Sequence, residues 1–181
     1  DVAVEMGTYT NAKYDTADEY LAAIELVNGT LTDARAMVEP YAENQTLKQH
    51  AEDLLKVSYK EIKKGAYNTF SNAFLANDGD EASTLASLQT MNENLSNAMF
   101  TYIANANPAK NVSFDLTWMI KNATPVDNVE GWVASDTPNH LNENHVNTEF
   151  WNQSGATLKQ TVKLPAGLYQ LRAQALTRLG S

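Results

Sequence analysis

The sequence contains no cysteine, so the chain can form neither a disulfide nor a thiolate metal site. No run of about 18 apolar residues occurs, which is the length that a membrane-spanning helix needs. Glycine-rich phosphate loops, a serine nucleophile elbow and paired-histidine metal motifs are also absent. We therefore predict a chain that is not transmembrane and not an enzyme, with no catalytic residues and no cofactor.

The composition is that of a folded protein, with 43% hydrophobic and 19% charged residues. The net charge of −9 comes from residues 1–107, which contain 16 acids and 7 bases, whereas residues 108–181 contain 6 of each. An acidic first part and a neutral second part do not attract a phosphate backbone. We expect no nucleic-acid partner.

Residues 1–107 show helical spacing and are predicted to form one domain. Asp15 is the predicted N-cap of a first helix, which glycine at position 29 should end. Thr30 would cap a second helix, which Pro40 should end or kink. The predicted buried stripes of these two helices are Ala17, Leu21, Ile24, Val27, Leu31, Ala34, Val38 and Tyr41.

Two longer helices follow in the prediction. Thr46 and Gln49 resemble a capping box at the head of a helix that runs to Phe74. Asn77–Asp80 resembles the start of a calcium loop, but no ligand pattern follows it, so a capping turn is the better interpretation and no motif supports a structural calcium. A last helix spans Leu85–Ala106. Short connections between long helices predict an up-and-down bundle of three or four helices.

Beyond residue 107 the pattern changes to the alternation of β-strands. The clearest case is Thr157–Arg178, which reads as two strands joined by a turn in which Pro165 presets φ and Gly167 adopts positive φ. Three more strands are predicted at Val112–Ile120, Gly131–Val133 and Thr148–Trp151. The fold class predicted for the whole chain is α+β in two parts, with the helical bundle in 1–107 and an antiparallel β-sandwich in 108–181.

The order of several short motifs is similar to a known family. These are Asp115-Leu116-Thr117, Gly131-Trp132, Glu149-Phe150-Trp151-Asn152, Gln160-Thr161 and Leu164-Pro165-Ala166-Gly167-Leu168-Tyr169. The sequence resembles galactose-binding-like jelly-roll modules of secreted and surface lipoproteins from Bacteroides-type bacteria, which often follow a helical module. The resemblance implies glycan binding through loops, a structural calcium in some members, and an extracellular or outer-surface location after removal of a signal peptide.

The ligand-binding candidates lie in the polar loop 136–147 and just after it. An aromatic ring can stack on a sugar, and neighbouring amide and imidazole groups can donate hydrogen bonds to its hydroxyls. A zinc site at the two histidines is the less favoured alternative, because a separation of five positions on a loop imposes no coordination geometry. The candidates are Trp151, Asn152, His140, Asn144 and His145. We also expect Trp132 and Tyr169 to be buried.

A jelly roll has about eight strands, and this sequence predicts five. The sheet should therefore have an open edge, which a second copy could cover as a homodimer. Two functions remain open. One is a non-catalytic surface or secreted module that binds glycans or mediates adhesion. The other is a structural spacer or assembly module without a small ligand.

Overall fold

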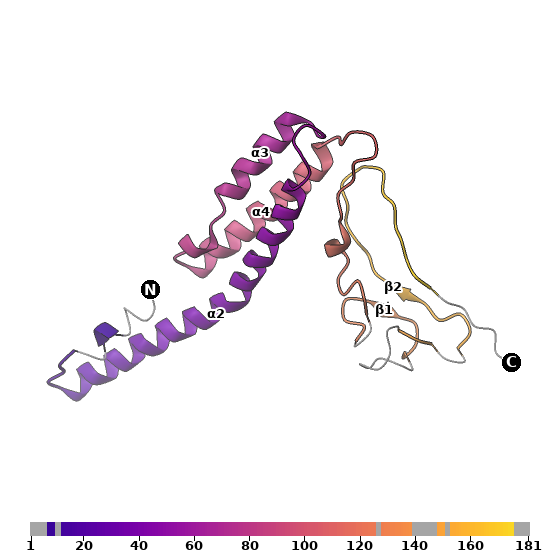
Figure 1. Cartoon of the computed structure of the whole chain (residues 1–181). Helices are drawn as coiled ribbons and strands as arrows, with labels where there is room; N and C mark the ends of the chain where they lie inside the picture. The colour runs from indigo at the N-terminus through magenta and orange to yellow at the C-terminus, as the bar shows by residue number, and fades with distance from the viewer. Residues whose placement is uncertain (1–6, 10–11, 126–127, 139–147, 151–152, 176–181) are drawn as a thin grey trace. The chain divides into compact units, whose positions relative to one another are not determined.

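The computed structural model describes residues 7–9, 12–125, 128–138, 148–150 and 153–175. The chain divides into two compact units, Asp1–Ala109 and Lys110–Ser181. Each unit is described by itself below. In the described part of the first unit, three α-helices account for most of the residues: α2 (Ala17–Leu55), α3 (Lys64–Leu75) and α4 (Leu85–Asn105) (Figure 1).

Helix α2 is a single helix of 39 residues, where the sequence analysis predicted two helices and the start of a third. Its N-cap is Thr16 and not Asp15: the Glu19 N–H donates to Thr16 Oγ1, and the Thr16 N–H donates to the Glu19 carboxylate. Gly29 lies within the helix, because a glycine there costs only about 1 kcal/mol and does not prevent the helix from continuing. The predicted break at this position is wrong.

Pro40 also lies inside α2 and does not end it. Figure 1 shows α2 changing direction about halfway along its length. A bend is the usual effect of an internal proline, which removes one hydrogen bond and crowds the preceding turn. The predicted capping box at Thr46 is wrong, since the Thr46 hydroxyl donates to the Ala42 carbonyl within the continuous helix.

The predicted helix from Thr46 to Phe74 is interrupted between Leu55 and Lys64. Ser58 competes with helical bonding there, because its carbonyl accepts from the Glu61 N–H and its hydroxyl oxygen accepts from the Lys60 N–H. At the turn after α3, Asp78 caps the 3₁₀ helix η1 (Gly79–Glu81) by accepting from the Asp80 N–H, which confirms the capping interpretation. Thr84 is the N-cap of helix α4 and forms a second capping box there.

Helix α4 packs against both α2 and α3 and supplies more buried apolar side chains to the core of the first unit than any other described helix. The rings of Phe70 on α3 and Tyr102 on α4 are stacked, with centroids 4.6 Å apart and planes at 16°. Both residues are 2% exposed. Figure 1 shows that α3 and α4 lie beside the C-terminal half of α2 only, so the other half extends past them. The remaining core side chains are Ala23, Ala51, Leu54, Ile62, Leu88, Leu95, Met99 and Ala106.

A cluster of three asparagines joins α2 to α4 and to the turn after α3. Asn44 is 0% exposed, and its Nδ2 donates to Asn77 Oδ1 at 2.9 Å and to Asn92 Oδ1 at 2.8 Å. Asn77 Nδ2 donates to a backbone carbonyl of α4, and Asn92 Nδ2 donates to the Pro40 carbonyl. A Cβ at Gly79 would lie 2.4 Å from Asn44 Oδ1, so this close approach requires glycine.

The second unit is not a β-sandwich or a jelly roll, and the predicted fold class and the family resemblance are wrong on this point. Among its described residues the sheet has two short strands, β1 (Val133–Ala134) and β2 (Leu158–Lys159). They pair antiparallel, with Val133 opposite Lys159 and Ala134 opposite Leu158. The predicted strand Val112–Ile120 instead contains the 3₁₀ helix η2 (Thr117–Met119).

The reason for η2 is local. Asp115 Oδ1 accepts hydrogen bonds from both the N–H and the hydroxyl of Thr117, which turns the backbone away from an extended path. These hydrogen bonds lower the pKa of the exposed Asp115 carboxyl. Asp115-Leu116-Thr117 is the first of the motifs on which the family resemblance was based, and in the structure these residues form a turn.

The asparagine cluster generates a prediction for stability. Replacing Asn44 with alanine leaves the Oδ1 atoms of Asn77 and Asn92 without their donor, and each buried unsatisfied acceptor costs about 1–3 kcal/mol. We expect Asn44→Ala to lower the free energy of unfolding by at least about 2 kcal/mol. The exposed neighbour provides the control: Gln45→Ala should change it by less than about 0.5 kcal/mol. Urea unfolding followed by circular dichroism measures both, and equal values would contradict the structural role of the cluster.

Candidate functional site

The second unit is held together by one side chain more than by its sheet. Gln160 follows β2, and its amide behaves like a piece of backbone: Oε1 accepts from the Lys121 N–H at 2.8 Å. Its Nε2 donates to the carbonyls of Lys121 and Gly131, both at 2.9 Å. Three chain segments that are distant in sequence therefore meet at one amide. We call these three hydrogen bonds the Gln160 clip.

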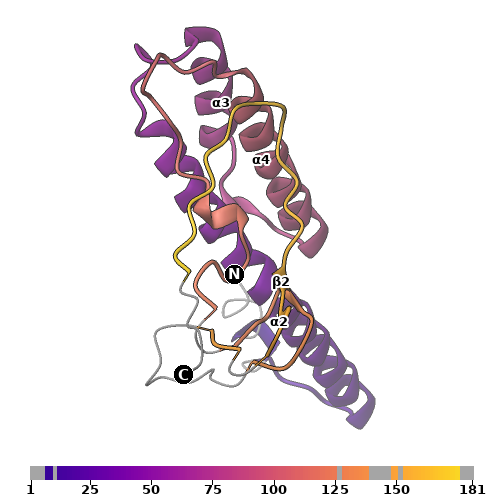
Figure 2. The ribbon, with the colours of Figure 1, turned by 90° about the vertical axis from the view of Figure 1, so that its right-hand side faces the viewer.

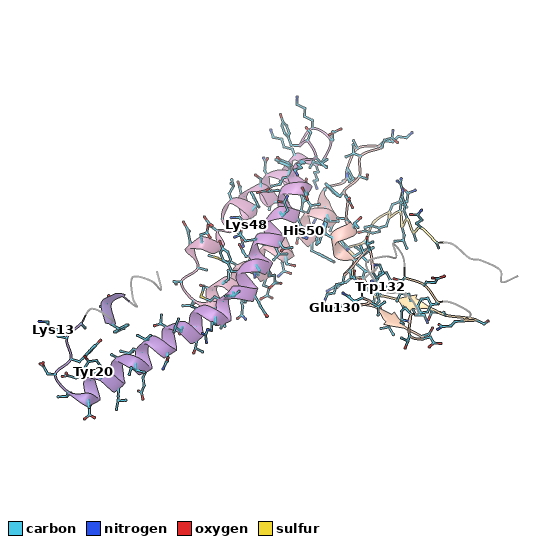
Figure 3. The ribbon with its side chains drawn as sticks, turned by 60° about the horizontal axis from the view of Figure 1, so that its bottom comes forward. Lys13, Tyr20, Lys48, His50, Glu130 and Trp132 are labelled. Atoms are coloured by element: carbon cyan, nitrogen blue, oxygen red, sulfur yellow. The ribbon has the colours of Figure 1, made fainter. Side chains whose placement is uncertain are left out.

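The residues around the clip have restricted conformations. Gly131 has φ +81°, and a Cβ there would lie 2.8 Å from Lys121 Cβ, so glycine is required. Asn122 has φ +48°, its Nδ2 donates to the Asn128 carbonyl, and its own carbonyl accepts from Trp132 Nε1 at 2.9 Å. Trp132 is half-buried and not fully buried as predicted. Figure 3 shows Trp132 beside Glu130 in this part of the unit.

An open groove runs past the clip. Its lining includes three lysines, Lys121, Lys159 and Lys163, and its other residues are neutral. These cations are on exposed residues, where water and salt screen their charge. The groove by itself defines no ligand.

The segment after the clip is the most unusual part of the unit. Figure 2 shows it as two extended arms that stay apart along their length. Within the described chain, the backbone of Leu164–Ala175 makes no hydrogen bond to another backbone group. The predicted hairpin ladder between 157–164 and 168–175 is therefore wrong, because β2 pairs with β1 and not with the following arm.

The turn between the arms is closed by a side chain. Tyr169 Oη donates to the Pro165 carbonyl at 2.6 Å, and the Tyr169 ring lies against Gly167. Gly167 is not among the glycines with positive φ, so that part of the turn prediction is wrong. Tyr169 is 41% exposed and Leu171 is 80% exposed, which also contradicts the expected burial of Tyr169. We call Leu168–Ala175 the free arm.

The five predicted ligand-binding residues cannot be placed by this structure. Trp151, Asn152, His140, Asn144 and His145 lie outside the described residues. Glycan binding through them stays a prediction. Among the residues that are described, no three His, Asp or Glu side chains gather in a way that could hold a metal ion. None of the described helices is both long and apolar enough to cross a membrane.

Comparison with known proteins adds no family. No protein-family model, no curated protein and no solved structure matches this chain. The suggested relation to Bacteroides-type surface proteins therefore has no support from relatives, and the described fold contradicts its jelly-roll part.

The clip generates the second prediction. Gln160→Ala removes one acceptor and two donated hydrogen bonds, so the amide proton of Lys121 loses its partner. We expect this proton to exchange with solvent at least tenfold faster, and Trp132 fluorescence to shift toward that of exposed tryptophan. Gln174→Ala, at an exposed glutamine of the free arm, should change neither signal. Unchanged exchange at Lys121 in Gln160→Ala would show that the clip is dispensable.

Proposed function

We propose that the chain is a non-catalytic assembly module whose free arm pairs with the free arm of a second copy. The observation that carries the proposal is the unpaired backbone of Leu168–Ala175 in an extended segment with exposed apolar side chains. An extended chain with open N–H and C=O groups is a template for another strand. This favours the assembly function over the glycan-binding one.

The residues of the free arm suit pairing with an identical partner. Its only charge is Arg172, and an antiparallel arrangement centred between Leu171 and Arg172 places each arginine opposite a leucine of the other copy. Like charges are therefore not directly opposed. Eight extended residues span about 26 Å, which is a common length for a strand in a stable sheet.

The side chains add apolar contact to this ladder. Tyr169 and Leu171 lie two residues apart and so on one face of the arm, and Ala173 and Ala175 continue that face. Leu168 is fully exposed and begins the opposite face. A paired arm would remove these groups from water, and each pair of facing apolar residues contributes roughly 0.2–1 kcal/mol beyond an alanine pair.

A double proline variant tests the proposal. Neighbouring N–H groups point to opposite sides of a strand, so Gln170→Pro with Leu171→Pro removes one donor from each edge of the arm. The full chain carrying both prolines should associate at least tenfold more weakly than the unchanged chain, because one lost ladder bond costs on the order of 1.4 kcal/mol. Sedimentation at micromolar concentration measures the change as a lower average mass.

The matched control keeps the backbone donors. Gln170→Thr with Leu171→Thr changes the same two side chains to a residue that favours strands, and this chain should keep the average mass of the unchanged protein. Two results would overturn the proposal. One is an unchanged chain that is monomeric, and the other is a proline variant that has the same average mass as the unchanged chain.

A further inference from the structure

The groove beside the Gln160 clip is held in shape by the clip itself. It has a volume of about 650 Å³, and its lining comes from three segments that are distant in sequence. Lys121, Gly131 and Gln160 all line it, and these are the residues that the clip joins by hydrogen bonds of 2.8 and 2.9 Å. The walls of the groove are therefore fixed relative to one another, as is usual for binding sites that are formed before the ligand arrives.

The charge of the groove runs against the composition of the chain. The chain contains 22 acids and 13 bases, yet three lysines line the groove and no described acid does. Neither Lys121 nor Lys159 forms an ion pair with a described residue. A concave surface with unpaired cations and no acid favours an anionic ligand. The described acids of the second unit, none of which lines the groove, are Asp115, Glu130, Asp136 and Glu149.

The lysines have the spacing of an extended chain. From 159 to 163 the burial alternates: Lys159, Thr161 and Lys163 are exposed, whereas Gln160 and Val162 are half-buried. The two lysines therefore lie on one face, about 13 Å apart along the chain. A second extended peptide that lies along this face presents every second side chain toward it at the same intervals of about 6.7 Å. Carboxylates at alternate positions of such a peptide match the lysines.

The neutral lining also suits a peptide. Val133 lies opposite Lys159 in the sheet and so on the same face, and its side chain is 72% exposed. Together with Met119 it offers apolar contact to the methylene groups of acidic side chains. None of the lining residues is aromatic, whereas an aromatic ring is the usual platform for a sugar. These features favour an acidic peptide over an anionic glycan.

We propose that the groove binds an extended, acidic peptide segment of a partner protein, whose carboxylates pair with Lys121, Lys159 and Lys163. This binding site is distinct from the free arm and does not depend on association through it. Because the lysines are exposed, the ion pairs are individually weak and sensitive to salt.

The test titrates the full chain with the acetylated peptide Glu-Thr-Glu-Thr-Glu at low ionic strength and follows the backbone amide signals by NMR. We expect the signals of Lys121, Gly131 and Thr161 to shift, and those of the free arm to stay in place. High salt should weaken the binding at least tenfold, because it screens exposed charges. The permuted peptide Glu-Glu-Glu-Thr-Thr has the same charge without the alternation, and it should bind at least threefold more weakly.

Two double variants separate the groove from the overall charge of the chain. Lys121→Gln with Lys159→Gln should weaken binding of the alternating peptide about tenfold, which corresponds to about 1.4 kcal/mol for two exposed ion pairs. Lys60→Gln with Lys64→Gln removes two exposed lysines from the first unit and should leave the affinity unchanged. Unchanged Trp132 fluorescence in both variants checks that the second unit stays folded.

Three results would overturn the proposal. One is equal binding by the alternating and the permuted peptide, which would reduce the effect to charge alone. Another is equal affinity in the two double variants. The third is tighter binding of a uronic acid oligomer with three carboxylates, which would assign the groove to an anionic glycan. None of these results depends on the free-arm proposal, since the residues of the groove lie outside Leu168–Ala175.

Discussion

The buried amide of Asn44 is the interaction on which the first unit depends. Asn44 is fully removed from water, and both of its side-chain N–H groups donate to other elements, one at the turn after α3 and one on α4, whereas its Oδ1 has no hydrogen-bond partner. These hydrogen bonds fix the position of α4 along the axis of α2. Because α4 starts near the middle of α2, the described parts of α3 and α4 lie beside the second half of the long helix and not beside its first half.

The second unit also relies on a side-chain amide to connect its segments. Gln160 replaces a backbone ladder with a single amide that binds two segments, and β1 and β2 contribute only two residues each. A sheet of that size buries too little apolar surface to be stable by itself. The backbone of the following arm, Leu168–Ala175, makes no hydrogen bond to another backbone group of the described chain.

The helices were largely predictable from the sequence, whereas their ends and the second unit were not. The apolar spacing from Leu85 correctly gave α4, and the Asn77–Asp80 turn was correctly interpreted as capping. The helix ends predicted at Gly29 and Pro40 were wrong. A helix-breaking residue lowers the stability of a helix but does not end it when the backbone hydrogen bonding continues on both sides. The local signal for the N-cap was present and was missed, because Thr16 followed three residues later by Glu19 has the spacing of a capping box.

For the second unit, alternation along the sequence was a poor guide to pairing. Leu158, Gln160 and Val162 do alternate with more exposed neighbours, but alternation says nothing about which strand lies opposite. The Asp115–Thr117 hydrogen bonds, formed within three residues, outweighed the strand preference around them. The clip could have been suspected only from a glutamine on the predicted inner face of a strand, where a polar group needs a partner.

The proline within α2 has a mechanical consequence. Pro40 has no backbone N–H, so the Ala36 carbonyl lacks the hydrogen bond that it would otherwise accept. Helix α2 therefore has one backbone hydrogen bond fewer at this point. A stretching force along the axis of α2 would be resisted by all its other backbone hydrogen bonds. Under load, α2 should therefore yield first at its centre, between the half that is anchored by α4 and the half that is not.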